Sequence, residues 1–230
     1  MSYALIFDFD GTILDTETPA WDSMVEVWKS FGLELPLDWW LKGMGTNRKD
    51  SWIDELERIL GKPLNRHELM ARRQQTKDTL TESKKPLPGV TDLIDAAGDR
   101  GIQLAVASSS AHEWVDRHLK RLNLYGHFEH VVCRDDVHGV SKPAPDVFVK
   151  ALELLGPNCT KAVAIEDSPN GVQAATDAGL DVVAVPNPLV KKLDFSLANL
   201  CLEHLTDVDP NQLLESLFEI PGINGPYDAR

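Results

Sequence analysis

Short apolar runs alternate with helix-length amphipathic segments along most of the chain. The runs show little polar alternation, which is typical of strands buried on both faces of a sheet. We expect strands at residues 4–7, 103–107, 130–133, 161–165 and 181–185. Helices are expected between them, at residues 90–99, 111–122, 145–155 and 169–178. This order predicts an α/β fold with a doubly wound parallel sheet.

Residues 15–85 depart from this alternation. They show no strand pattern, but apolar side chains recur there at helical spacing, as in Trp21, Met24, Val25 and Trp28. Tryptophans at this spacing usually build a core rather than a ligand site. The stiff passage Lys85–Gly89 (KPLPG) then returns the chain to the α/β pattern. We therefore expect an α/β core of residues 1–14 and 86–230, with a small helical cap domain of residues 15–85 inserted after the first strand.

The charge, cysteine content and apolar runs of the sequence exclude several classes of partner and site. The formal net charge of −13 argues against nucleic acid and anionic membranes as partners, because both are bound through excess Lys and Arg. The cysteines at 133, 159 and 201 are too widely spaced to indicate a disulfide framework or a zinc site. The sequence also contains no apolar run long enough to span a bilayer and no secretory pattern after Met1. A cytoplasmic protein is the expectation.

Two acidic pairs stand where strands are expected to end. Asp8 and Asp10 lie in the FDFDGT segment after the first strand, and Glu166 and Asp167 follow the strand at 161–165. Ligands of open α/β sheets bind outside the carboxyl ends of the strands. Clustered carboxylates there are costly unless a cation compensates them, and Mg²⁺ favours such oxygen ligands. Taken singly, each pair also fits a helix-capping loop, with Ser168 and Pro169 as N-cap and first helical residue.

Serines and a lysine complete the set of candidates. Residues 107–110 (ASSS) close a strand and open a helix, so their hydroxyls and backbone N–H groups suit a phosphate, although a serine run is usually only a cap. Lys142 precedes a proline-initiated helix, where a surface lysine is the ordinary interpretation. A cation at such a loop would also balance the charge of a phosphate.

These four elements, in this order, resemble the four motifs of the haloacid dehalogenase superfamily. The resemblance covers nearly the whole chain, including a helical cap after the first motif. It implies that Asp8 is a nucleophile that forms an aspartyl-phosphate. It also implies that Asp10 is the general acid that protonates the leaving oxygen and then, as a base, activates water.

The same resemblance implies the binding residues. The phosphate would be held at the positions of Thr12, Ser108, Ser109 and Lys142. A Mg²⁺ cofactor would be held by Asp8, the Asp10 carbonyl and Asp167, with Glu166 in support. The presence of Asp10 also disfavours carbon–halogen cleavage, because the dehalogenases do not carry this second aspartate in the same manner.

Within the superfamily, the chain is most similar to the β-phosphoglucomutase-like subgroup, whose members are usually monomers. Residues 41–51 (LKGMGTNRKDS) resemble that subgroup's cap substrate loop, which makes Gly45, Thr46 and Arg48 candidate substrate contacts. Residues 15–21 lack the histidine that the mutase carries there, which favours hydrolysis over phosphate transfer.

We therefore expect a phosphatase that acts on a small phosphorylated metabolite such as a sugar phosphate. A sugar phosphomutase is the main alternative. A phosphonatase would need a cap lysine for a Schiff base, and Lys29, Lys42 and Lys49 lie in no recognised motif. A non-catalytic phospholigand-binding protein is the remaining alternative, which the complete set of motif residues argues against.

Overall fold

The computed structural model describes residues 2–43 and 52–218 of the 230-residue chain. The chain divides into two units, one formed by Met1–Leu14 with Lys85–Arg230 and the other by Asp15–Lys84. Lys85, which the sequence pattern assigned to the helical part, belongs to the α/β unit. The candidate contacts Gly45, Thr46 and Arg48 lie outside the described residues.

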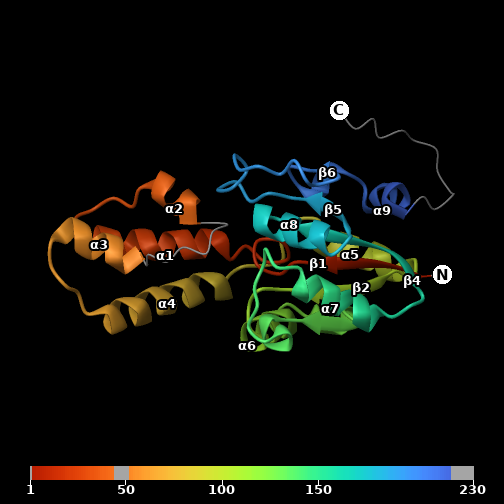
Figure 1. Ribbon diagram of the computed structural model, residues 1–230, viewed down its shortest axis with the longest axis horizontal. Helices are drawn as coiled ribbons and strands as arrows, with labels where there is room; N and C mark the ends of the chain where they lie inside the picture. The colour runs from red at the N-terminus through yellow and green to blue at the C-terminus, as the bar shows by residue number, and fades with distance from the viewer. Residues whose placement is uncertain (1, 44–51, 219–230) are drawn as a thin grey trace. The chain divides into compact units, whose positions relative to one another are not determined.

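The α/β unit is built on one parallel sheet with strand order β3-β2-β1-β4-β5-β6 (Figure 1). The strands are β1 (Ser2–Phe7), β2 (Gln103–Ala107), β3 (His130–Val132), β4 (Cys159–Glu166), β5 (Asp181–Ala184) and β6 (Leu200–Cys201). The predicted doubly wound fold is confirmed, with strand ends shifted by at most two residues. Strand β6 was not expected, because two residues are too few to carry a periodic pattern.

Helices cover both faces of the sheet (Figure 1). Alternate residues of β1 divide between two hydrophobic clusters, Leu5 and Phe7 into one and Ala4 and Ile6 into the other, and all four are fully buried. The first cluster includes α5 (Val90–Asp99), α6 (His112–Arg121) and α9 (Pro210–Phe218); the second includes α7 (Asp146–Leu155) and α8 (Pro169–Asp177). A strand buried on both faces needs this two-sided cover, which explains the continuous apolar run. Helix α9 was not predicted.

Shorter features complete this unit. Three 3₁₀-helices connect the larger elements: η1 (Tyr125–His127), η2 (Arg134–Val137) and η3 (Leu205–Asp207). Gly101 and Gly179 follow α5 and α8 with φ of 65° and 82°. This left-handed conformation is the one that a glycine after the end of a helix supplies.

The second unit is helical, with α1 (Glu17–Lys29), α2 (Leu37–Gly43), α3 (Trp52–Leu60) and α4 (Arg66–Glu82). No strand occurs among its described residues, which omit 44–51. Its core contains Trp28 and Trp40, which are 1% and 8% exposed, together with Met24 and Leu56. Trp28 therefore packs in the core, as the helical spacing of the apolar residues around it indicated.

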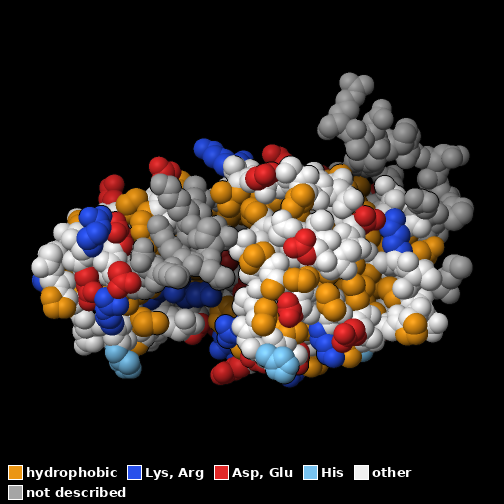
Figure 2. Space-filling view, in the orientation of Figure 1, with side chains coloured by type: hydrophobic (Ala, Val, Ile, Leu, Met, Phe, Trp, Pro, Cys, Tyr) orange, Lys and Arg blue, Asp and Glu red, His pale blue; other side chains and the backbone are white. Residues whose placement is uncertain are grey.

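The surface agrees with the acidic composition. Figure 2 shows acidic side chains interspersed with apolar ones on the face drawn. The cysteines are free thiols, with Cys133 buried, Cys159 partly buried and Cys201 exposed. Within the described parts of the chain, every helix is too short or too polar to cross a bilayer.

Burial of the helices against the sheet can be tested with a matched pair of leucines. Leu93 of α5 is 1% exposed, whereas Leu154 of α7 is 44% exposed. We expect Leu93→Ala to lower the free energy of unfolding by about 2–5 kcal/mol, because it leaves a cavity. Leu154→Ala should change it by less than about 0.5 kcal/mol. Urea denaturation of both variants measures the difference, and equal losses would contradict this assignment of the core.

Candidate active site

The loop after β1 is a tight turn that presses its backbone against a carboxylate. The Asp8 amide donates to the Ile165 carbonyl at 2.9 Å, and the Gly11 amide donates to the Leu14 carbonyl at 2.8 Å. Gly11 has φ of 89°. A Cβ at this position would lie 2.0 Å from Asp167 Oδ2, so a glycine is required both by the turn and by the close approach.

Lys142 joins the carboxyl ends of three strands. Its Nζ donates to Asp8 Oδ1 at 2.5 Å, to Glu166 Oε1 at 2.7 Å and to the Ala107 carbonyl at 2.7 Å. The lysine side chain is 6% exposed, so it is not the surface lysine of the ordinary interpretation. Burial alone would lower the pKa of Lys142, but the charges of Asp8 and Glu166 raise it above its ordinary value. The ammonium therefore stays charged and ties the loops after β1, β2 and β4 together.

Glu166 is fully buried and has hydrogen-bond partners on both oxygens. Oε1 accepts from Lys142, and Oε2 accepts from the Asp167 amide at 2.9 Å and from the Ser168 amide and hydroxyl at 3.1 Å each. Ser168 Oγ accepts from the Gly171 amide at 3.1 Å, which is the predicted N-cap of α8. A Cβ on Gly171 would lie 1.7 Å from Glu166 Oε1. The carboxylate is thus wedged against the first turn of α8.

Three buried carboxylates meet at this point. Side-chain oxygens of Asp8, Glu166 and Asp167 all lie within 4.8 Å of one another. Burial raises the pKa of Asp8 well above its ordinary value, although Lys142 opposes this shift. One ammonium does not neutralise three carboxylates, and a hard divalent cation with oxygen ligands would offset the remainder. The three carboxylates therefore fit Mg²⁺ as a ligand set, because their negative charge exceeds the charge of the single ammonium.

Asp10 is held apart from that cluster. Ser110 Oγ donates to Asp10 Oδ2 at 2.6 Å, and Trp114 Nε1 donates to Asp10 Oδ1 at 2.9 Å. The sequence pattern placed Ser110 in the serine run expected to suit a phosphate and gave no role to Trp114. Ser110 closes the serine run and precedes Ala111, the N-cap of α6, whereas Trp114 lies in the first turn of that helix. The positions of the two donors in the sequence carry no signal that points to Asp10, which lies 100 and 104 residues away from them.

The predicted phosphate-binding residues adjoin these groups. Ser108 is 1% exposed and its Oγ accepts from the Ser110 amide at 3.0 Å. Ser109 Oγ accepts from the Lys142 amide at 3.1 Å. Thr12 is 3% exposed, and its hydroxyl has no hydrogen-bond partner among the described residues. A buried hydroxyl in this condition calls for a further partner, which a bound ligand can supply.

The start of α6 is fastened to η2 through His112. Its Nε2 lies 2.7 Å from Asp136 Oδ2 and its Nδ1 lies 3.2 Å from Asp116 Oδ1. The His112 amide donates to Asp135 Oδ2 at 2.8 Å. Burial would lower the pKa of His112, but the hydrogen bonds with Asp116 and Asp136 raise it. The imidazole therefore bridges α6 and η2, and its protonated form is favoured by the two carboxylates.

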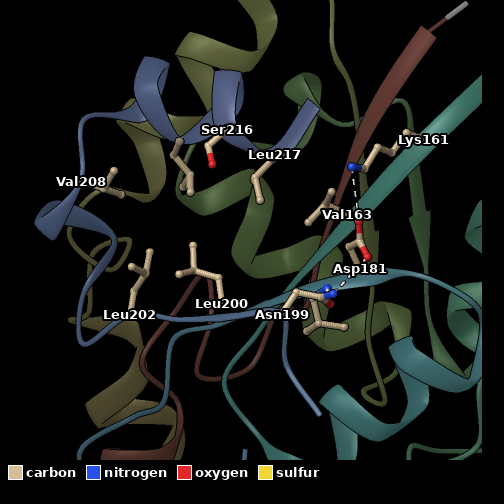
Figure 3. Close-up of a pocket in the computed structure, with 11 residues that line it drawn as sticks. Lys161, Val163, Asp181, Asn199, Leu200, Leu202, Val208, Ser216 and Leu217 are labelled. Carbon is tan, nitrogen blue, oxygen red and sulfur yellow. Dashed lines mark hydrogen bonds and ion pairs between the residues drawn. The ribbon is translucent and has the colours of Figure 1, made fainter. Parts of the chain in front are cut away.

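A separate cavity of about 220 Å³ lies between the sheet and α9 (Figure 3). Its polar end is formed by Lys161 and Asp181, whose Nζ and Oδ2 lie 3.4 Å apart, and by Asn199, whose Nδ2 donates to Asp181 Oδ1 at 3.2 Å. Lys161 lies in the first half of β4 and Asp181 begins β5, whereas the clustered carboxylates follow the other ends of the strands. This cavity is therefore distinct from the carboxylate site.

A parallel sheet with paired carboxylates and a lysine at its carboxyl edge defines a class of hydrolases. Residues 5–185 match the family model described as haloacid dehalogenase-like hydrolase. The chain belongs to this family, and the predicted enzyme class is confirmed at that level.

Relatives with assigned names support the same class. The chain is 40% identical over 217 residues to "Putative phosphatase YhcW" of Bacillus subtilis, which covers 94% of this chain and 98% of that protein. It is 35% identical to fructose-1-phosphate phosphatase YqaB of Escherichia coli, over 79% of this chain and 95% of that protein. A solved structure, "putative beta-phosphoglucomutase from Thermotoga maritima", is 26% identical with a TM-score of 0.73 and covers 95% of this chain and 99% of that one.

The close approach of the first loop to Asp167 generates a prediction. Gly11→Ala places a methyl group against the Asp167 carboxylate as well as straining the backbone, whereas Gly101→Ala strains the backbone alone, because no atom lies within 4 Å of its Cβ. We expect Gly101→Ala to cost about 1–2 kcal/mol of stability. Gly11→Ala should cost more and abolish most phosphatase activity. Urea denaturation with an activity assay compares them, and equal behaviour of the two variants would show that the contact with Asp167 is unimportant.

The His112 bridge predicts a pH-dependent stability. Because its folded-state pKa is raised, the bridge contributes fully below the unfolded value of about 6.5 and is lost as pH rises through the folded value. The side chain is 35% exposed, so the contribution should be below about 1 kcal/mol. His112→Gln should therefore lower the melting temperature at pH 6 and have little effect at pH 9. The exposed His67→Gln is the control, and a loss that is the same at both pH values would rule out the charged bridge.

Proposed function

We propose that this chain is a Mg²⁺-dependent phosphatase that hydrolyses a small phosphorylated metabolite through an aspartyl-phosphate on Asp8. The observation that carries the proposal is the contact of Lys142 Nζ with Asp8 Oδ1 at 2.5 Å and Glu166 Oε1 at 2.7 Å, inside a cluster of buried carboxylates. Lys142 in this position orients the Asp8 carboxylate at the end of β1. Its positive charge, together with that of a bound metal ion, would offset the negative charge of a phosphate at this site. Phosphoryl transfer depends mainly on such positioning and charge neutralisation.

In the first step, an Asp8 carboxylate oxygen forms a bond to phosphorus while the bond from phosphorus to the ester oxygen breaks. The leaving oxygen takes a proton from Asp10, which becomes a carboxylate. Lys142 offsets the negative charge that would otherwise repel the phosphate dianion from Asp8. The backbone and hydroxyls of Ser108 and Ser109, at the start of the segment leading into α6, suit the phosphate oxygens.

In the second step, water forms a bond to phosphorus and the bond to Asp8 breaks. Asp10 accepts the proton that water loses and so returns to its starting state. Inorganic phosphate leaves, and Asp8 is again a carboxylate. The two steps together consume one ester and one water, and they release one alcohol and one phosphate.

The metal would be held by Asp8 and Asp167, together with the Asp10 backbone carbonyl. When bound, Mg²⁺ would supply positive charge to the phosphate oxygens during transfer. We assign Glu166 chiefly to holding Lys142, because its two oxygens already accept from four donors on Lys142, Asp167 and Ser168. The predicted role of Glu166 at the metal is thereby indirect.

The substrate class rests on the relatives. The Escherichia coli relative is named as a fructose-1-phosphate phosphatase, and the Bacillus subtilis relative is named as a phosphatase. A sugar phosphate or a similar small monoester is therefore the class that we propose. The roles of Gly45, Thr46 and Arg48 in reading the leaving group, and of the helical unit as a cap, stay predictions, since these three residues lie outside the described parts of the chain.

A sugar phosphomutase is the second candidate, favoured by the similarity to a structure named as a β-phosphoglucomutase. Residues 15–21 of this chain lack a histidine, which is the reason to prefer hydrolysis. A mutase would transfer phosphate to a hexose phosphate faster than to water. Its activity would also require a bisphosphorylated sugar as primer.

The proposal is tested with p-nitrophenyl phosphate as the probe. We expect phosphate release that requires Mg²⁺ and stops with EDTA. Asp8→Asn should lower the rate by about 10⁴-fold or more, because the covalent step is lost. The control is Asp177→Asn, an exposed aspartate at the end of α8, which should retain the full rate.

Two other outcomes would be decisive. Activity that survives Asp8→Asn would sink the aspartyl-phosphate mechanism. Failure to hydrolyse this probe or any sugar monophosphate, together with isomerisation of a hexose phosphate when a bisphosphate is added, would establish the mutase instead.

A further inference from the structure

The carboxylate of Asp10 is anchored at both oxygens by one helix start. Ser110 Oγ donates to Oδ2 at 2.6 Å and Trp114 Nε1 donates to Oδ1 at 2.9 Å. A carboxylate on a loop can turn about two side-chain torsions, and a single hydrogen bond leaves one of its oxygens free to move. Donors on both oxygens define the plane of the carboxylate as well as its position.

The indole of Trp114 is itself held in place. Its ring meets the ring of His118 edge-on with centroids 4.3 Å apart, and the guanidinium carbon of Arg117 lies 5.2 Å from its centroid. His118 is fully buried and stacks on Phe9, the residue before Asp10, with centroids 6.3 Å apart. The His118 ring therefore packs against both Trp114, which donates to Asp10, and Phe9, which lies in the same loop as Asp10.

Ser110 is fixed from the other side. Its amide donates to Ser108 Oγ at 3.0 Å, and its carbonyl accepts from the Arg134 amide at 3.1 Å. Two residues later, the His112 bridge fastens the start of α6 to Asp136 of η2. These bonds fix the backbone at the start of α6, from which both donors extend.

We propose that Trp114 and Ser110 are positioning residues that hold the Asp10 carboxylate in one orientation for proton transfer. The inference rests on the proposed phosphatase function, in which Asp10 gives and then takes a proton. Acid–base catalysis of this kind contributes about 10²–10⁴-fold and depends on geometry before all else. Neither residue is assigned a contact with the substrate.

The two proton transfers allow a sharp test, because p-nitrophenolate is a weak base that leaves without needing a proton. Formation of the aspartyl-phosphate from this probe should therefore be nearly insensitive to Asp10, whereas its hydrolysis by water still needs the base. We expect Trp114→Phe and Ser110→Ala each to lower kcat by about 10- to 100-fold while KM does not rise. Stopped-flow mixing should then show a burst of one p-nitrophenolate per enzyme before the slow steady state.

Conservative and matched variants separate positioning from folding. Ser110→Thr keeps the hydroxyl and should recover most of the rate lost in Ser110→Ala. Trp28→Phe is the control for loss of an indole, because Trp28 Nε1 has no hydrogen-bond partner among the described residues. Ser216→Ala, at an exposed serine of α9, is the control for loss of a hydroxyl. Both controls should retain the kcat of the unmodified chain.

The failure of this inference is distinguishable from failure of the proposed function. If the unmodified chain shows Mg²⁺-dependent turnover that Asp8→Asn abolishes, the function stands. Within that result, normal kcat without a burst in both Trp114→Phe and Ser110→Ala would overturn the positioning role. A lowered melting temperature with unchanged kcat would likewise mean that these residues act in folding alone. Absence of turnover in the unmodified chain would instead refute the proposed function.

Discussion

The interaction on which the site depends is the buried contact of Lys142 with Asp8 and Glu166. Taking a charged group out of water costs several kcal/mol unless partners surround it, and removal of one partner from such a set is strongly destabilising. Here the partners lie at the carboxyl ends of three different strands, so the lysine holds this edge of the sheet together. Its single charge still leaves an acidic excess, since Asp167 adjoins the same cluster. The arrangement therefore has the charge balance of a site that binds both a cation and a phosphate.

The fold makes this concentration of charge possible because β1 is central and apolar. All of its inner residues are buried, and the two faces of the sheet are covered by separate hydrophobic clusters. Polar residues are admitted only where the strand ends. The turn at Gly11 then brings the backbone so close to Asp167 that no side chain fits between them. Burial of apolar residues within the sheet stabilises the fold. This stability offsets the free energy that it costs to bury several carboxylates at the carboxyl edge.

Asp10 shows a different kind of support. Its carboxylate is bonded to Ser110 and Trp114 rather than to the cationic cluster. In the proposed reaction the nucleophile and the proton donor are consequently held by separate networks, one ionic and one of neutral donors. The ammonium of Lys142 thus orients the nucleophile, and the hydroxyl and indole donors orient the acid. Family membership and the names of relatives place the chain among phosphatases.

Most of the sheet could be predicted from the sequence alone, because strands buried on both faces have continuous apolar runs. The ends of two of these strands were marked by turn residues and acidic pairs. Asp8 and Asp167 were identifiable for that reason, since parallel strands bring their carboxyl ends to one edge. Lys142 follows no strand directly, and its role was implied by the resemblance to the family. The short strand Leu200–Cys201 was missed because two residues carry no periodic pattern. Helix α9 was missed as well. The pairing of these last elements depends on the strand edge and the helix surfaces that the rest of the sheet offers them. Only the tertiary structure decided that Glu166 accepts a hydrogen bond from Lys142 and that Trp114 donates one to Asp10. Those contacts join residues 24 and 104 positions apart through their side-chain conformations, and a local pattern holds no information about which distant partner a donor will meet.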